Sequence, residues 1–190
     1  PKNEQLPIRY PVYWDPVYIE KATSLINEMG RRYNGHPAIE SVAIAHTGRW
    51  GEMHIADHQP LEPWIAKEFS VKNFLYGHRQ LIDAYLNAFP DTPLQQSIGS
   101  PSFQHKLEDA SESLDYLASH GVMLKYGGLG KSWKPSRSPY LDESIMHVLS
   151  RYKTKSKVVF ENLVLPEALQ LGLDMNMSYW QRGGEAAGLK

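Results

Sequence analysis

Residues 39–54 read IESVAIAHTGRWGEMH, and our prediction of the fold starts from this segment. Its first part, Ile39 to Ala45, is short, β-branched and almost wholly apolar, which is typical of a strand buried on both faces of a sheet. The part that follows, His46 to His54, is too polar to be buried for packing alone. The stretch therefore predicts a buried parallel strand whose carboxyl end carries a functional loop.

A cycle of strand and helix repeats along the rest of the chain. Apolar periodicity predicts helices at 17–33, 71–89, 104–119, 141–152 and 166–171. Short apolar runs predict strands at 39–45, 93–98, 122–126, 157–160 and 174–180. Asp15 is the expected N-cap of the first helix, Pro16 its first residue and Asn34-Gly35 its stop. Strict alternation of this kind indicates an α/β protein with a parallel sheet, either open or closed.

A nucleotide-binding version of such a sheet is disfavoured. Gly127-Gly128-Leu129-Gly130-Lys131-Ser132 superficially resembles a phosphate loop, but it lacks the glycine-to-lysine spacing that the loop requires. No other strand is followed by a glycine-rich phosphate fingerprint. A closed (β/α) barrel is therefore favoured over a doubly wound sheet.

The chemistry of a (β/α) barrel lies where its strands end at their carboxyl termini. Two carboxylates, Glu52 and Glu161, each follow an apolar strand in this chain, and they are the candidate catalytic residues. The other polar and aromatic residues near the strand ends are candidates for substrate binding, because aromatic faces stack on sugar rings and polar groups bind their edges. These candidates are His46, Arg49, Trp50, His54, Gln96, Tyr126, Trp133, Asn162, Tyr179 and Trp180.

Residues 48–54, GRWGEMH, resemble the G-x-W-G-E-x-H segment of glycoside-hydrolase-like (β/α)8 barrels, which are distantly similar to the clan A glycosidases and β-galactosidases. Residues 11–16, PVYWDP, fit the same group. The resemblance implies that Glu52 is the acid/base at the end of strand four and Glu161 the nucleophile at the end of strand seven. Trp180 would then be the aromatic residue at the end of strand eight. It also implies an oligo- or polysaccharide as the partner.

Two features depart from the pattern of that family. Clan A enzymes carry Asn directly before the acid/base Glu, where this chain has Gly51, so the contact to the sugar 2-hydroxyl is left unassigned. The mapping also uses strands four to eight only. We therefore expect residues 1–190 to be a single domain, the C-terminal part of a barrel. Because a partial barrel leaves two sheet edges open, a missing chain segment or a partner is expected to cover them.

Composition excludes several other classes of function. With 20 basic and 21 acidic side chains, the net charge of −1 offers no broad basic field for the backbone of DNA or RNA. The chain has no cysteine, which excludes disulfides and thiolate metal sites. Its apolar stretches are shorter than the roughly 18–20 residues that cross a bilayer. We expect a soluble protein without nucleic-acid or membrane partners, in a compartment that composition leaves open.

Three functions remain after this. The leading prediction is a retaining glycoside hydrolase that uses Glu52 and Glu161 and needs no cofactor or metal. A non-catalytic carbohydrate-binding barrel is the first alternative, and Gly51 in place of Asn favours it. A metal-dependent hydrolase built on His46, His54 and His58 is the second alternative, because His is a common metal ligand.

Overall fold

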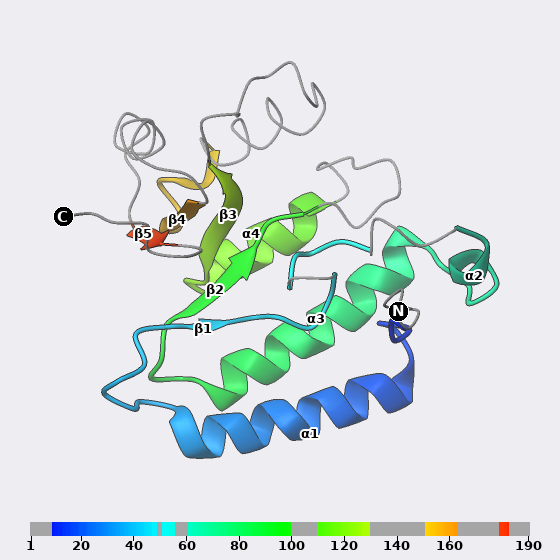
Figure 1. Ribbon diagram of the computed structural model, residues 1–190, viewed down its shortest axis with the longest axis horizontal. Coiled ribbons are helices and arrows are strands. Elements are labelled where there is room, and N and C mark those ends of the chain that lie inside the picture. Colours follow the sequence, from blue (N-terminus) through cyan, green and yellow to red (C-terminus); the bar gives the residue numbers. More distant parts are fainter. Residues whose placement is uncertain are drawn as a thin grey trace, which may run out of the picture.

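The computed structural model describes residues 9–48, 51–55, 61–99, 110–129, 151–162 and 179–182, and of these it gives the backbone alone at 61, 127–129, 160–162 and 179–182. The helices are α1 (Pro16–Tyr33), α2 (Leu61–Ile65), α3 (Val71–Ala88) and α4 (Ser111–Ser119). The strands are β1 (Val42–Ala43), β2 (Leu94–Ser97), β3 (Met123–Leu129), β4 (Val158–Asn162) and β5 (Tyr179–Arg182). This alternation confirms the predicted α/β class (Figure 1).

Helix α1 begins and ends where local sequence signals place its ends. The Asp15 carboxylate accepts hydrogen bonds from the backbone N–H groups of Val17 at 2.8 Å and Tyr18 at 3.2 Å, which satisfies two of the free donors of the first turn. At the other end the chain leaves the helix at Asn34 and turns at Gly35, whose φ of 68° favours glycine. The predicted cap, start and stop of this helix are confirmed.

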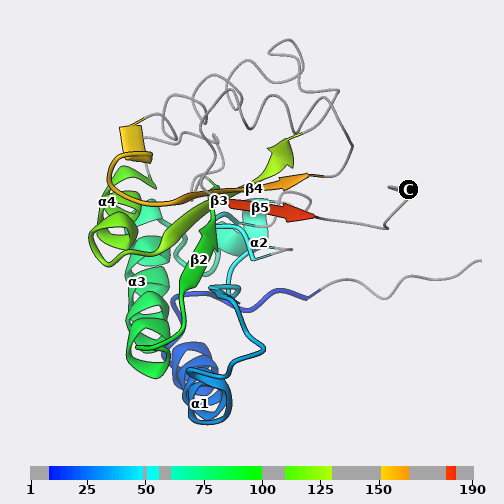
Figure 2. The ribbon, with the colours of Figure 1, turned by 90° about the vertical axis from the view of Figure 1, so that its left-hand side faces the viewer.

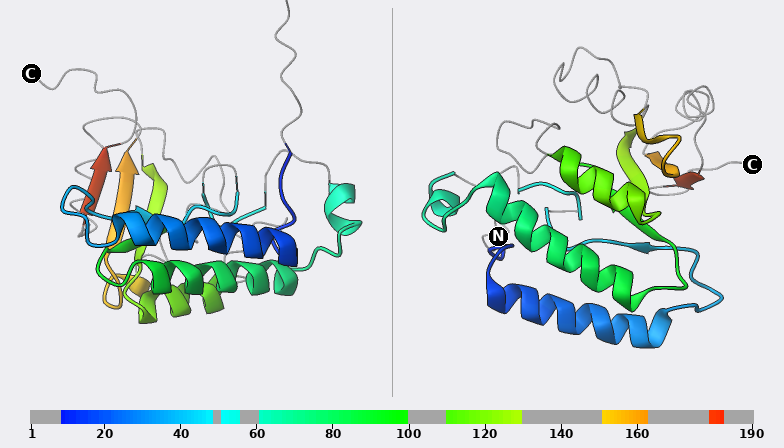
Figure 3. Two further views of the ribbon diagram at one scale, coloured as in Figure 1. Left: turned by 90° about the horizontal axis from the view of Figure 1, so that it is seen from below. Right: turned by 180° about the vertical axis from the view of Figure 1, so that it is seen from behind.

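The five strands form one parallel sheet in the order β1-β2-β3-β4-β5, so each strand pairs with the next one along the chain. Helices α1, α3 and α4 all lie on one side of this sheet (Figures 2 and 3). Between successive parallel strands the chain therefore crosses on the same side at least from β1 to β2 and from β2 to β3. Sequential order with one-sided crossovers describes a singly wound sheet.

The main core fills the space between the sheet and these helices. Alternate residues of the strands face the helices, and Ile44, Leu94, Leu124 and Val158 are all at most 5% exposed there. They pack against the apolar faces of α3 and α4, whose buried members include Phe74, Leu81, Leu114 and Leu117. The opposite face of the sheet carries the other alternate set, in which Ala43 and Ala45 are exposed.

Some predicted boundaries differ from the structure. Strand β1 is shorter than the predicted 39–45. Among the described residues it pairs with β2 alone, through the bonds from Val42 N–H to Pro93 O and from Ile44 N–H to Gln95 O. Strand β3 continues through Gly127 and Gly128 to Leu129, with a register shift after Tyr126, so the predicted strand end at Tyr126 is wrong.

Other elements could not be compared in full. Helix α2 was not predicted, since its five residues are too few for a periodic pattern. The predicted helix at 166–171 lies outside the described residues. The same is true of most of 141–152 and of most of the predicted residues that precede α4 in 104–119 and β5 in 174–180. None of the helices in the described ranges is long and apolar enough to cross a membrane.

Candidate functional site

The loop after β1 leaves the sheet and returns to it at Glu52. The register that pairs Ala43 with Gln95 would, if continued, pair Ala45 with Ser97. Instead the chain departs after Ala45, and Glu52 forms a parallel bridge with Ser97. The Met53 N–H donates to the Ser97 carbonyl at 3.2 Å, which holds the returning segment beside β2. Glu52 therefore sits at the carboxyl ends of β1 and β2, as the sequence predicts for a site residue.

Two glycines shape this loop. Gly48 has φ of 68° and Gly51 has φ of 87°, both in the left-handed region where other residues are strained. A Cβ atom added to Gly51 would lie 2.8 Å from the Cβ atom of Ala45, and one added to Gly48 would lie 2.7 Å from the Glu52 carbonyl oxygen and 3.1 Å from its carboxylate. A side chain at position 51, such as the Asn of the clan A pattern, would therefore clash with Ala45.

The Glu52 carboxylate has a titratable partner within its own segment. Its Oε2 atom lies 3.5 Å from Nε2 of His54, and the two side chains are 24% and 14% exposed. The other ring nitrogen, Nδ1, is 2.6 Å from the Ile55 carbonyl oxygen. Because a carbonyl oxygen can only accept, Nδ1 carries the hydrogen of this bond, and Nε2 is the ring nitrogen that lies near the Glu52 carboxylate. Glu52 and His54 are therefore close polar neighbours at the end of the sheet.

Backbone register relates Glu52 to Glu161. The pairings Glu52–Ser97, Ser97–Lys125 and Lys125–Val159 form one row across the sheet, and Glu161 follows Val159 by two residues along β4. Because side-chain direction alternates with a period of two, positions in one row and positions two residues apart belong to the same face set. The backbone positions of Glu52 and Glu161 thus belong to the same face set of the sheet. They are three strand positions apart and lie near its carboxyl end.

Two other predicted site residues face the helices instead. The His46 ring lies with its centroid 5.0 Å from that of His78 and 5.9 Å from that of Tyr85, both on α3. Gln96 is fully buried, and its Nε2 atom donates to the carbonyl oxygens of Gly51 at 3.0 Å and Ser97 at 2.9 Å. His46 and Gln96 therefore lie behind the loop and not on the Glu52 side of the sheet.

Burial makes this region behind the loop unusual. Loss of solvation lowers the pKa of His78 to about 4 and the pKa of His46 well below its usual value. No ring nitrogen of either histidine has a hydrogen-bond partner in the described part of the chain. The nearby Gln96 side chain acts in the opposite direction and raises the pKa of His78, although the Gln96 amide oxygen and the His78 ring make no hydrogen bond. Both imidazoles are consequently neutral at pH 7.

His78 was missed from the sequence, although a signal was present. It lies four residues after Phe74 and four before Ile82, on the buried stripe of α3, where a histidine interrupts an otherwise apolar face. Tyr13, from the segment before α1, is also buried near the loop, and burial and the nearby Glu52 carboxylate are among the causes that raise its pKa above the usual range. Neither residue follows a strand, and site residues were expected only at the ends of strands.

The remaining predicted residues are placed only in part. Tyr126 is half-buried and packs against the core. Glu161, Asn162, Tyr179 and Trp180 are described by their backbone in β4 and β5. Arg49, Trp50, Trp133 and His58 lie outside the described residues. His46 contacts α3 while His54 contacts Glu52, and within the described ranges no group of three or more His, Asp or Glu side chains is placed to hold a metal ion.

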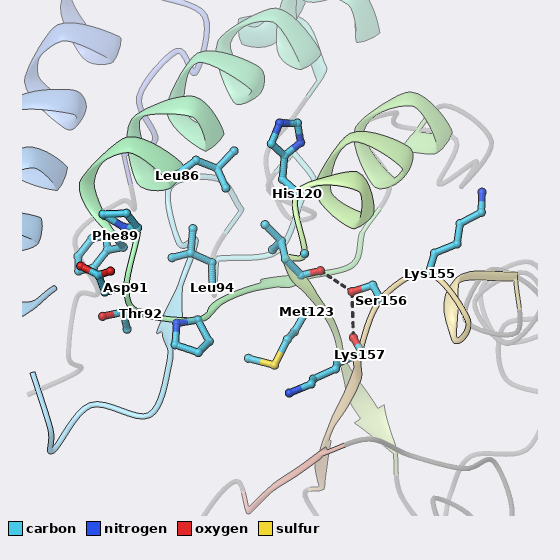
Figure 4. A pocket seen from close by; sticks show the side chains of 14 residues that line it. Leu86, Phe89, Asp91, Thr92, Leu94, His120, Met123, Lys155, Ser156 and Lys157 are labelled. Atoms are coloured by element: carbon cyan, nitrogen blue, oxygen red, sulfur yellow. Dashed lines mark hydrogen bonds between the residues drawn. The ribbon is translucent and has the colours of Figure 1, made fainter. Parts of the chain in front are cut away.

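A cavity of about 580 Å³ lies at the opposite, amino-terminal end of the strands (Figure 4). Its lining mixes apolar residues with Lys155, Lys157 and His120. The Lys155 and Lys157 side chains point apart, and Lys155 makes an ion pair with Asp115 at 3.6 Å outside the cavity. The cavity therefore lacks the convergent polar groups of a built binding site.

Comparison with known proteins adds no relative: no family model, no curated protein and no solved structure matches the chain.

Proposed function

We propose that this chain is part of a carbohydrate-processing (β/α) barrel and acts as a retaining glycoside hydrolase. The sequential strand order and the helices on one side of the sheet support the barrel, because a doubly wound sheet reverses its strand order and carries helices on both faces. The resemblance of residues 48–54 to glycoside-hydrolase-like barrels supports the substrate class.

The register relation between Glu52 and Glu161 is the observation that carries this proposal. Both positions belong to the face set away from the helix layer, near the carboxyl end of the sheet. In a closed barrel that face is the interior, where carboxylates from separated strands converge on one substrate. A pair of carboxylates on opposite sides of a glycosidic bond is the minimum machinery of most glycosidases.

The proposed reaction has two steps. The Glu161 carboxylate attacks the anomeric carbon while Glu52 gives its proton to the leaving oxygen, which breaks the glycosidic bond and forms a glycosyl ester. Glu52, now a carboxylate, then removes a proton from water as the water attacks the same carbon and releases Glu161. His54, whose Nε2 atom lies 3.5 Å from the Glu52 carboxylate, is the polar neighbour of this acid/base residue.

A non-catalytic carbohydrate-binding barrel is the second candidate. The observation that favours it is Gly51, because its contact with Ala45 excludes the amide side chain that clan A enzymes place before the acid/base residue. Such a protein would keep the cleft and bind sugar without breaking it.

Turnover and binding separate the two candidates. The full-length protein is assayed against a panel of aryl glycosides and oligosaccharides, together with Glu52→Gln, Glu161→Gln and the exposed control Glu112→Gln on α4. The hydrolase proposal predicts cleavage that both site variants lose and the control keeps. Binding without cleavage, unchanged in Glu161→Gln, supports the second candidate. The absence of both cleavage and binding overturns the two proposals together.

A further inference from the structure

Gln96 is a buried amide on β2 whose two hydrogen bonds both go to backbone carbonyls. Its Nε2 atom donates to the Gly51 carbonyl oxygen at 3.0 Å, across 45 residues of sequence, and to the Ser97 carbonyl oxygen at 2.9 Å. The residue is 0% exposed. A carbonyl accepts only, so the amide must present its nitrogen to both groups, and the assignment of its oxygen and nitrogen follows.

The two carbonyls belong to the residues that hold Glu52 in place. Gly51 directly precedes Glu52, and Ser97 is its bridge partner on β2. Met53 directly follows Glu52, and its N–H also donates to the Ser97 carbonyl, at 3.2 Å. One side chain therefore contacts the backbone before Glu52 and the strand position beside it. Thr47 closes the same loop through its hydroxyl, which donates to the Glu52 carbonyl at 2.8 Å.

We propose that Gln96 is the positioning residue for Glu52: by bonding Gly51 and Ser97 from the helix side, it fixes the loop that presents the Glu52 carboxylate at the sheet end. This rests on the proposed function, in which Glu52 is the acid/base. Gln96 does not touch substrate in this role, because its side chain is buried against α3 on the other side of the sheet.

The chemistry of position 96 follows from its surroundings. An amide has two N–H hydrogens for two carbonyls, whereas a carboxylate has none and a thioether offers no donor. The amide oxygen of Gln96 lies near His78 and makes no hydrogen bond with it. Methionine at 96 would keep much of the side-chain volume and leave the Gly51 carbonyl without this donor, which weakens the loop at the residue before Glu52.

The experiment compares Gln96→Met with Thr92→Val. Thr92 is also buried at β2, at its amino-terminal side, and its hydroxyl accepts from the Gly35 N–H at 2.7 Å, so its loss removes a comparable bond far from the loop. Amide hydrogen exchange of the wild-type chain and both variants is measured at Met53, with global stability measured in parallel. Glycosidase kcat and KM are measured on the same samples.

Gln96→Met is expected to speed exchange at Met53 by about tenfold to hundredfold beyond the change in global stability, because the part-buried Gly51 carbonyl loses its side-chain donor. It is also expected to lower kcat with little change in KM, while Thr92→Val alters neither. Equal exchange at Met53 in the two variants, after correction for stability, overturns the positioning role.

A measurement on the wild-type chain covers the case in which Gln96→Met does not fold. The side-chain amide protons of Gln96 are expected to exchange slowly and to show nuclear Overhauser contacts to Gly51 and Ser97. Rapid exchange without these contacts overturns the proposal. These readouts need no turnover, so a chain that cleaves no glycoside contradicts the proposed function while the exchange data still decide the role of Gln96.

Discussion

The Gly51 backbone lies directly against Ala45, the residue from which its own loop departs, so that the loop folds back on the end of β1. A Cβ atom at Gly51 would be 3.0 Å from the Cα atom of Ala45 and 2.8 Å from its Cβ atom. This contact lets the chain return to the sheet beside Ser97 after a short excursion. The position of Glu52 therefore depends on Gly51 and Ala45, neither of which has a polar or reactive side chain.

Replacement of Gly51 by Asn is predicted to destabilise the chain and not to restore the clan A arrangement. The left-handed φ of 87° and the contact with Ala45 act together. We expect a loss of about 1–3 kcal/mol in the free energy of unfolding, most of it from the contact with Ala45, because Asn adopts a left-handed φ more readily than most residues. Chemical denaturation measures the loss.

Gly121 provides the matched control for this substitution. Its φ is 71°, but an added Cβ atom would meet nothing within 4 Å. Gly121→Asn should therefore show the backbone strain alone, and the difference between the two variants isolates the contact with Ala45. Equal losses at the two positions would show that the contact does not constrain the loop.

Acid is predicted to weaken the fold through His46 and His78. The pKa of His78 in the folded chain, about 4, lies below the ordinary value of 6.5, so the unfolded chain binds protons more readily. Stability is then full above pH 6.5 and is lost as the pH falls from 6.5 toward 4. For His78 alone the loss between pH 7 and pH 4 is about 3 kcal/mol.

His78→Phe tests this assignment, because phenylalanine fills a similar volume and cannot be protonated. Its free energy of unfolding, measured by denaturant at pH 7 and at pH 4.5, should depend less steeply on pH than that of the wild-type chain. His120→Phe, at an exposed histidine that follows α4, is the control. If both variants show the wild-type slope, burial of His78 is not the cause of the acid sensitivity.

The N-cap of α1 is predicted to contribute measurably to stability. Asp15→Ala removes the acceptor of two backbone N–H groups in the first turn, and we expect a loss of about 1 kcal/mol. Asp15→Asn should keep most of this contribution, since its amide oxygen can accept the same bonds. Thermal unfolding of the two variants provides the comparison, and a loss as large for Asn as for Ala would assign the effect to charge instead.

Local features of this fold could be predicted from the sequence, and relations between distant residues could not. Asp15, Pro16 and Gly35 act within a few residues of their own positions, so the ends of α1 were predicted correctly. The strands were found because buried parallel strands are short apolar runs. Strand β1 proved shorter than predicted, and among the described strands it pairs with β2 alone.

The candidate site was predicted less completely for a related reason. When a strand is buried on both faces, its sequence does not say which residues face the helices, so Gln96 and His46 were grouped with Glu52 although they lie behind the loop. His78 and Tyr13 follow no strand and reach this region only through tertiary packing. Gly51 looked like the loss of an Asn, whereas its contact with Ala45 makes glycine a requirement of the loop.

The distance between the carboxyl groups of Glu52 and Glu161 in an experimental structure tests the proposed function most directly. Both carboxylates are predicted to lie on the face of the sheet away from α3, about 5–5.5 Å apart, as a retaining glycosidase requires. Carboxylates that lie on opposite faces of the sheet, or that are buried in separate ion pairs, would contradict it.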